Sequence, residues 1–386
     1  MKRLIAAVLA CATLAVSAQA VAPPPIAARA FILMDAQSGA IIAAADEATR
    51  YDPASLTKIM TAYIVFGMLR DRKLDAAQAV TVSQKAWKAE GSRMFLDPNR
   101  PVSIEDLMKG LIVQSGNDAA IALAEAAAGT EEAFVELMNR QAERMGLANT
   151  HFMNASGQPV QGHYASARDI ATLALALIRD FPDQYPRYSQ REFVYNRIKQ
   201  SNRNRLLWTD PTVDGMKTGF TEAAGYCLVA SAVREFPNLG QAGAAPGKRR
   251  LLSVVLNTSS MEARANESQK LLNWGFQAFD TVRLFDDAEP MATAEVWKGK
   301  AKQVKLGTAG GLFVTLPKGD SAKLQTRIER AEPLLAPLTK GQRVGTVKVT
   351  TASGLAVVDV ALVVLEPVEQ AGMFGRAWDS IRLWIR

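Results

Sequence analysis

The spacing of hydrophobic positions changes along this chain, and each change marks a different kind of structure. Residues 31–35 and 40–43 are apolar runs that flank a short turn, a pattern typical of a β-hairpin. Over residues 53–69 the apolar positions recur at helical spacing, with Tyr63 and Phe66 on one face. The same spacing predicts four further helices, over residues 104–113, 118–128, 133–145 and 167–178.

After Trp208 the apolar residues form short continuous runs instead of helical stripes. The pattern predicts three strands and a closing helix, over residues 215–220, 226–233, 251–256 and 263–279. Segment 235–250 holds two prolines and three glycines, which indicates a long hairpin loop. We expect its basic cluster, Lys248, Arg249 and Arg250, at a solvated tip.

Residues 281–370 lose helical periodicity and predict a separate all-β module. Its strands are expected at residues 302–306, 312–316, 324–328, 345–350 and 357–365. Residues 371–386 return to helical spacing, with Phe374, Trp378 and Ile381 on one apolar face and arginines on the other. This segment is too short to span a bilayer, so we expect a helix lying in a membrane surface. A helix docked on the protein itself is the alternative.

Residues 1–20 have the pattern of a secretion signal. Lys2 and Arg3 precede an apolar stretch over residues 4–16, and residues 18–20 form a small-x-small cleavage site. Because the apolar stretch is short for a membrane span, we expect cleavage and export.

Composition excludes several classes of protein. The full chain has 386 residues, 48% of them apolar, and the 366 that remain after removal of residues 1–20 are enough for two domains with buried cores. Cys227 is the single cysteine left after export, which excludes an internal disulfide. His151 and His163 lack metal-binding spacing, so we expect ordinary loop histidines and neither metal nor cofactor. The net charge of +7 is scattered, which argues against nucleic acid as a partner.

The candidate chemistry lies in three strings: Ser55-Leu56-Thr57-Lys58, Ser115-Gly116-Asn117 and Lys217-Thr218-Gly219. On a helix, Ser55 and Lys58 share a face and their side-chain ends come within hydrogen-bonding reach. A serine hydroxyl needs a base, and Lys58 can serve if burial and a nearby cation such as Lys217 destabilise its ammonium.

The second and third strings supply the remaining groups. Ser115 stands at a turn where its hydroxyl can pass a proton to a leaving amine, and the Asn117 amide can hold the base and a substrate backbone. Lys217 and Thr218 offer a charge and a hydroxyl to a substrate carboxylate.

The third string also lies between two glycines. Gly215 and Gly219 are expected to keep the strand bare, so that an extended peptide can lie against it as an added strand. Each string alone also fits a structural role, as a helix cap, an interhelical turn or a strand end. Occurring together and in this order, they favour a serine acyl-transfer enzyme that uses no histidine.

With their neighbours, the strings resemble the D-alanyl-D-alanine carboxypeptidases among the low-molecular-mass penicillin-binding proteins. The resembling segments are residues 52–63, 114–120, 213–219 and 263–268. The resemblance implies an α/β (α+β) serine β-lactamase/transpeptidase-like domain over residues 21–280, with an antiparallel sheet and a helical cluster. A small all-β domain over residues 281–370 and an anchor helix over residues 371–386 would follow.

The resemblance also implies individual roles. Ser55 would form the acyl-ester, Lys58 would accept its proton and Ser115 would relay it. Backbone N–H groups of Ser55 and Phe220 would form the oxyanion hole, and Phe220 stands where family members often have histidine. The substrate-binding set would be Asn117, Lys217, Thr218, Gly219, Phe220, Arg203 and Arg264.

The activity so implied is removal of the terminal D-alanine from peptidoglycan stem pentapeptides, with acylation by β-lactams. The enzyme would act at the periplasmic face of the cytoplasmic membrane as a peripheral protein. A class A-like β-lactamase uses the same three strings, although its middle string is usually Ser-Asp-Asn. D,D-endopeptidase or transpeptidase action and a non-catalytic wall-binding scaffold are further alternatives.

Overall fold

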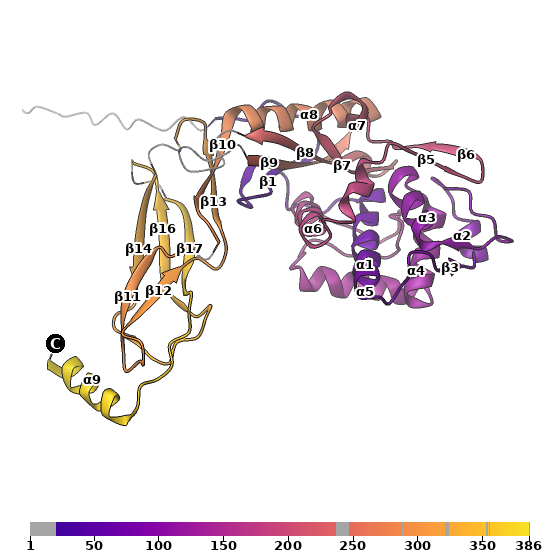
Figure 1. Ribbon diagram of the computed structural model, residues 1–386. Helices are drawn as coiled ribbons and strands as arrows, with labels where there is room; N and C mark the ends of the chain where they lie inside the picture. The colour runs from indigo at the N-terminus through magenta and orange to yellow at the C-terminus, as the bar shows by residue number, and fades with distance from the viewer. Residues whose placement is uncertain are drawn as a thin grey trace, which may run out of the picture.

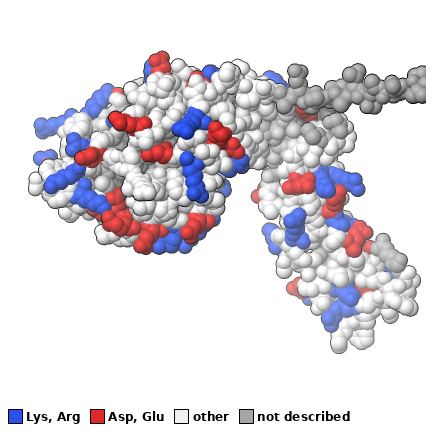
Figure 2. All heavy atoms as spheres, turned by 180° about the vertical axis from the view of Figure 1, so that it is seen from behind, with Lys and Arg blue, Asp and Glu red and all other residues white. Residues whose placement is uncertain are grey.

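The computed structural model describes residues 21–236, 247–287, 289–320, 324–352, 354 and 356–385. The predicted signal segment, residues 1–20, lies outside this part of the chain. A larger body of helices and sheet is followed by a smaller body of strands, and a last helix lies at the far end of the smaller body (Figure 1). On the face drawn in Figure 2, acidic and basic side chains are intermixed over both bodies.

The larger body is built on a five-stranded antiparallel sheet with the strand order β2-β1-β9-β8-β7. Its strands are β1 Ala30–Asp35, β2 Ile41–Ala45, β7 Val213–Thr221, β8 Gly225–Phe236 and β9 Gly247–Thr258. The predicted hairpin and the three strands predicted after Trp208 are confirmed. β7 is the last strand in the order, so one of its edges is unpaired within the sheet.

Both faces of this sheet are covered, which explains why its strands are continuous apolar runs. Along β1, Ala30 and Ile32 pack into the core shared with the helical cluster. Phe31 and Leu33 point the other way, into the core beneath α8 (Met261–Ala278). Figure 1 shows α8 on one face of the sheet and the helical cluster on the other.

The helical cluster follows the predicted spacing. Its main helices are α1 Lys58–Arg70, α3 Ile104–Lys109, α4 Asn117–Ala128, α5 Glu131–Arg144 and α6 Ala167–Asp180. The helical turns are η1 Ala54–Thr57, α2 Gln84–Trp87, η2 Gly110–Gln114, η3 Tyr185–Ser189 and α7 Leu206–Thr209. Two further two-stranded sheets pair β3 Ala79–Val80 with β4 Val102–Ser103, and β5 Glu192–Tyr195 with β6 Ile198–Ser201.

The smaller body contains a six-stranded sheet in the order β14-β16-β17-β12-β11-β15, and a separate pair, β10 and β13. Its strands are β10 Phe279–Phe285, β11 Ala292–Trp297, β12 Gln303–Gly307, β13 Leu312–Pro317, β14 Gln325–Arg330, β15 Leu334–Leu335, β16 Arg343–Thr350 and β17 Ala356–Val364. The sequence analysis missed β10, β11 and β15. β10 continues directly from α8, and the alanine and glutamate of β11 are poor strand formers, so neither strand has a clear local signal.

The last helix, α9 (Met373–Ile385), binds the smaller body through its polar side. The buried carboxylate of Asp379 accepts the backbone N–H of Lys298 at 2.7 Å and lies 3.2 Å from Lys302 Nζ. The apolar face remains in solvent, with Phe374 91% and Trp384 89% exposed. Among the described helices, none is both long enough and apolar enough to cross a membrane.

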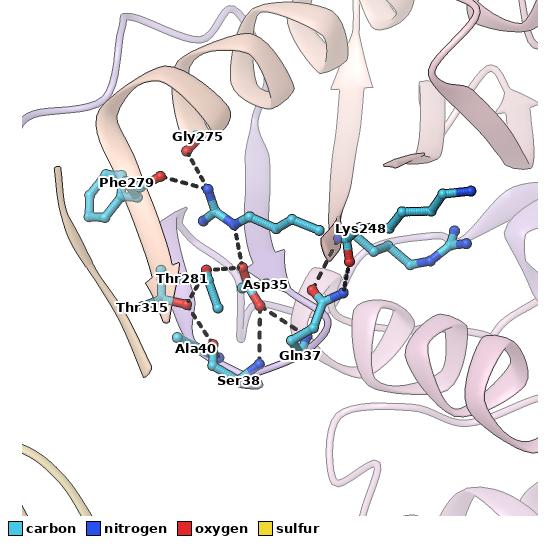
Figure 3. A network of polar contacts seen from close by, with 11 residues as sticks. Asp35, Gln37, Ser38, Ala40, Lys248, Gly275, Phe279, Thr281 and Thr315 are labelled. Carbon is cyan, nitrogen blue, oxygen red and sulfur yellow. Dashed lines mark hydrogen bonds and ion pairs between the residues drawn. The ribbon is translucent and has the colours of Figure 1, made fainter. Parts of the chain in front are cut away.

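The two bodies meet at a buried polar network around Asp35 (Figure 3). The Asp35 carboxylate accepts the backbone N–H groups of Gln37 and Ser38 at 2.9 and 3.0 Å. From the smaller body, Thr281 donates its hydroxyl to Asp35 Oδ2 at 2.6 Å and lies 3.0 Å from the Thr315 hydroxyl. These contacts join the end of β1 to the β10–β13 pair.

Arg249 provides the positive charge of this network, which corrects the expectation of a solvated tip. β8 and β9 continue as paired strands as far as Phe236 and Gly247, so the basic cluster belongs to the sheet. Arg249 is fully buried, and its Nε donates to Asp35 Oδ2 at 2.8 Å. Its guanidinium also lies 5.0 Å from the centre of the Phe236 ring. Charge and glycine content alone could not reveal that a buried aspartate was available as its partner.

An Arg249→Met substitution is expected to lower the free energy of unfolding by about 3–5 kcal/mol, because it leaves the Asp35 carboxylate buried without its cation. Lys248→Met, at the exposed neighbouring position, is the matched control and is expected to change stability by less than about 0.5 kcal/mol. Urea unfolding of both variants measures the difference. Equal stabilities would show that the ion pair is not required at this junction.

Candidate active site

Ser55 and Lys58 lie on either side of the boundary between η1 and α1. Asp52 stabilises the start of the turn, since its carboxylate accepts the backbone N–H of Ala54 at 2.9 Å. Ala54 has a φ of 46°, a left-handed conformation that costs a non-glycine residue about 1–3 kcal/mol. The three-residue spacing then places Lys58 Nζ 2.9 Å from Ser55 Oγ.

The amine of Lys58 is buried among oxygen acceptors. It lies 2.7 Å from Asn117 Oδ1 and 2.6 Å from the carbonyl oxygen of Ser156. Burial lowers the pKa of Lys58 to about 7; the charge of Asp118 opposes this shift and that of Arg203 adds to it. A neutral amine can donate to both oxygens and accept the hydrogen of the serine hydroxyl, which is the arrangement of a general base.

Ser115 lies between η2 and α4 and has a φ of 63°. Its hydroxyl oxygen is 2.7 Å from Lys217 Nζ, which also donates to the carbonyl of Thr218 at 2.9 Å. Burial lowers the pKa of Lys217 well below its usual value, and the nearby charge of Lys58 acts in the same direction. The two buried amines therefore disfavour each other's charge.

Asp118 holds the loop that faces this turn, a role that the sequence analysis did not assign. Its carboxylate accepts the backbone N–H groups of Met94 and Phe95 at 2.9 Å and that of Leu96 at 3.2 Å. Gly116 is required beside it, because a Cβ at this position would lie 2.7 Å from Asp118 Oδ1.

Gly215 and Gly219 allow close packing of β7, and Gly219 also lines the cleft. A Cβ at Gly215 would lie 2.6 Å from Tyr185 Oη, and one at Gly219 would lie 3.2 Å from the backbone oxygen just before η1. Gly157, with a φ of +87°, approaches more closely still, since its Cβ would lie 1.8 Å from a backbone oxygen of η1. Strand β7 and the Gly157 loop thus pack directly on the turn that carries Ser55.

His163 supports the same turn from within the core. Its Nδ1 accepts the backbone N–H of Met153 at 3.0 Å, so Nε2 carries the hydrogen and donates to Thr57 Oγ1 at 2.8 Å. Burial lowers the pKa of His163 to about 4, which keeps the ring neutral at ordinary pH. The second histidine, His151, bonds the carbonyl of Gly162. Ordinary hydrogen bonds for both histidines were expected.

The structure brings all the candidate site residues to one cleft of about 420 Å³. Those that line it are Ser55, Ser115, Asn117, Arg203, Thr218, Gly219, Phe220 and Arg264. Lys58 and Lys217 lie behind this surface and contact its two serine hydroxyls. In the part of the chain that the structure describes, no group of three His, Cys, Asp or Glu side chains is placed to hold a metal ion.

Several lining residues were missed by sequence reasoning, among them Ser92, Gln158, Tyr226 and Met261. Tyr226 had a signal, because the β7–β8 hairpin pairs it directly with Phe220. The other three come from loops or from the start of α8, whose approach to the cleft depends on packing between distant segments.

Comparison with known protein families gives two matches. A family described as D-alanyl-D-alanine carboxypeptidase matches residues 17–260. A second family, described as the C-terminal domain of penicillin-binding protein 5, matches residues 279–370.

Individual proteins agree with these families. The D-alanyl-D-alanine carboxypeptidase DacC of Escherichia coli is 44% identical, over 95% of this chain and 90% of its own length. The crystal structure of penicillin-binding protein 5 from Haemophilus influenzae is 41% identical with a TM-score of 0.83, and the match covers 91% of this chain and all of that one. Penicillin-binding protein D2 from Listeria monocytogenes, solved in a cefotaxime-bound form, is 27% identical with a TM-score of 0.59, covering 66% of this chain and 99% of its own.

The lowered pKa of Lys58 predicts how reactivity depends on pH. Because only the neutral amine can accept the serine proton, acylation of Ser55 by a neutral ester is expected to rise about tenfold per pH unit below pH 7 and to level off above it. Arg203→Met removes a cation that lowers this pKa, so the midpoint is expected to move to higher pH. Arg205→Met, two residues away and exposed like Arg203, is the control. A pH-independent rate would exclude Lys58 as the base.

Proposed function

The chain belongs to the family of D-alanyl-D-alanine carboxypeptidases, serine hydrolases of the bacterial cell wall, and we propose that it removes the terminal D-alanine from peptidoglycan stem pentapeptides through an acyl-enzyme on Ser55. The observation that carries this proposal is the pair of amine–hydroxyl contacts, Lys58 with Ser55 and Lys217 with Ser115, at one cleft. The D-alanyl-D-alanine bond is cleaved, and water supplies the atoms of the new acid and amine.

Acylation begins with proton transfer from the Ser55 hydroxyl to the neutral amine of Lys58. The serine oxygen attacks the carbonyl carbon of the scissile bond, and backbone N–H groups of Ser55 and Phe220 stabilise the oxyanion. The proton then passes through Ser115 to the leaving amine, and D-alanine departs. In the second half of the cycle, water attacks the ester and the serine hydroxyl is restored.

Recognition of the substrate's terminal carboxylate uses a cluster of basic and hydroxyl side chains. Lys217 and Thr218 lie on β7, and Arg264 reaches the same strand by donating to the carbonyl of Gly219 at 3.0 Å. Burial lowers the pKa of Arg264 to about 10, so its guanidinium is still positive at neutral pH. Arg203 adds a further charge at the rim. A carboxylate is the anion that suits such a cluster of charged and hydroxyl donors.

The peptide itself binds along the unpaired edge of β7, as an added strand. The amide nitrogen of Asn117 donates to the carbonyl of Glu90 at 2.7 Å while its oxygen accepts from Lys58, so the side chain is held beside the nucleophile.

A β-lactamase is not favoured as the function. The matched relatives are carboxypeptidases over most of the chain, and the match includes the smaller body.

If Ser55 forms the acyl-enzyme, its replacement is expected to abolish both D-alanine release and labelling by penicillin. Purified protein is expected to release D-alanine from a D-alanyl-D-alanine pentapeptide and to retain a labelled penicillin, which peptide mapping would locate on Ser55. Ser55→Ala is expected to lower D-alanine release at least about a thousandfold and to abolish labelling. Ser201→Ala, an exposed serine on β6, is the control. Labelling at another residue, or rapid release of hydrolysed penicillin, would overturn the proposal.

We also propose that α9 holds the enzyme on the periplasmic face of the cytoplasmic membrane. Phe374, Trp378 and Trp384 expose an apolar face while Asp379 secures the opposite side to the β-module. A helix with this division of side chains binds at the interface of a bilayer.

Vesicle binding tests this location. The double variant Trp378→Ser/Trp384→Ser is expected to bind anionic phospholipid vesicles at least about tenfold more weakly than the parent chain, since both indoles lose their burial in the interface. Trp208→Ser, at a half-exposed tryptophan in α7, is the matched control. Sedimentation that is equal for all three proteins would exclude α9 as the anchor.

A further inference from the structure

A short segment, residues 154–158, contacts the reacting groups although it belongs to no helix or strand. The carbonyl oxygen of Ser156 lies 2.6 Å from Lys58 Nζ. The next residue, Gly157, packs on η1, and Gln158 after it lines the cleft. The position of this segment therefore affects both the base and the turn that carries the nucleophile.

Two side chains from the helical cluster hold the residue just before Ser156. Glu131 is the first residue of α5, and its Oε1 accepts the backbone N–H of Ala155 at 2.9 Å. Thr61 lies on α1 and donates its hydroxyl to the Ala155 carbonyl at 2.7 Å. Glu131, Thr61 and Ala155 are all buried, so water does not readily replace a lost partner. Both backbone groups of Ala155 thus depend on these two side chains.

Asn154 gives the rest of the segment its shape. Its Oδ1 accepts the backbone N–H groups of Ser156, Gly157 and Gln158 at 3.2, 2.7 and 3.1 Å. Its amide nitrogen donates to the Gln158 carbonyl at 2.8 Å. Because these bonds tie the segment to itself, its attachment to the two helices through Ala155 sets where the Ser156 carbonyl lies.

The direction of the free electron pair on Lys58 depends on this carbonyl. A neutral amine has two hydrogens and one electron pair. Asn117 Oδ1, at 2.7 Å, and the Ser156 carbonyl accept the two hydrogens, which leaves the electron pair for the Ser55 hydroxyl. Without the Ser156 carbonyl the amine is free to rotate and to present a hydrogen to Ser55, an orientation that cannot accept the serine proton.

We propose that Glu131 is a positioning residue for acyl transfer, because its hold on Ala155 keeps the Ser156 carbonyl against the amine that serves as the base. The inference rests on the proposed function and deepens it by naming a residue that controls the rate of acylation without lining the cleft. The second oxygen of Glu131 lies 2.9 Å from Lys85 Nζ, which fixes the carboxylate from the outer side.

The test separates the rate of acylation from binding. Labelling by a fluorescent penicillin at rising concentrations gives a limiting rate constant for acylation and a dissociation constant for the complex that precedes it. Glu131→Ala is expected to lower the limiting rate constant about ten- to hundredfold and to change the dissociation constant less than about twofold, because the base is misplaced while the cleft is intact. The final extent of labelling is expected to equal that of the parent, which a partly unfolded protein would not reach.

Glu132→Ala is the matched control, since Glu132 is exposed and pairs with the same lysine, Lys85, at 2.7 Å. Its limiting rate constant is expected to equal that of the parent. Glu131→Gln keeps an oxygen that can accept the Ala155 N–H, so its rate constant is expected to stay within about threefold of the parent's. Thr61→Val removes the second attachment of Ala155 at nearly constant volume and is expected to lower the same rate constant about three- to tenfold.

A limiting rate constant equal to the parent's in both Glu131→Ala and Thr61→Val overturns the proposal. A loss that Glu132→Ala shares, or one that Glu131→Gln fails to restore, overturns it as well. If Glu131→Ala does not fold, the result for Thr61→Val decides alone. Absence of labelling at Ser55 in the parent protein would instead refute the proposed function.

Discussion

Lys58 can act as a base because its amine is kept out of water, and the charge of Arg203 adds to the effect of burial. Both conditions depend on the rest of the larger body. The side chain is sealed by α1, the Ser156 loop and Asn117, and Lys217 approaches from β7. Asp118 is close enough to oppose the shift, but its oxygens are already engaged by backbone N–H groups of the facing loop. The site therefore keeps two amines buried without giving either a dedicated carboxylate partner.

Close backbone approach is what allows three distant segments to reach this pair of amines. A side chain at Gly157 would collide with the backbone of η1, and a Cβ at Gly219 would lie 3.2 Å from the backbone oxygen just before it. Ala54 accepts a left-handed φ at the same place. The cost of these conformations is met by the surrounding core, and the result is a nucleophile whose position is set before substrate binds.

The smaller body depends on a different buried charge. Arg249 and Asp35 are paired at the end of the sheet, and hydroxyl groups of Thr281 and Thr315 extend the network into the β10–β13 pair (Figure 3). Each partner would be costly to bury alone, so the junction depends on both being present. At the other end of the smaller body, the carboxylate of Asp379 holds α9 in place by accepting the backbone N–H of Lys298. The cleft and the exposed apolar helix face are thus connected through polar contacts at both ends of one module.

The local spacing of apolar residues determined much of the secondary structure of this protein. Helical spacing and apolar runs predicted the main helices and the strands of the central sheet, because side chains repeat with the period of the element they form. The three-residue separation of Ser55 and Lys58 implied their contact for the same reason. Tertiary structure alone decided which distant groups meet. Lys217 reaches Ser115 because β7 is the edge strand beside η1, and Arg249 is buried because its partner Asp35 lies at the end of β1. Phe220 and Met261 line the same cleft although they come from β7 and α8. Such contacts join residues tens to hundreds of positions apart, and no short-range period records them.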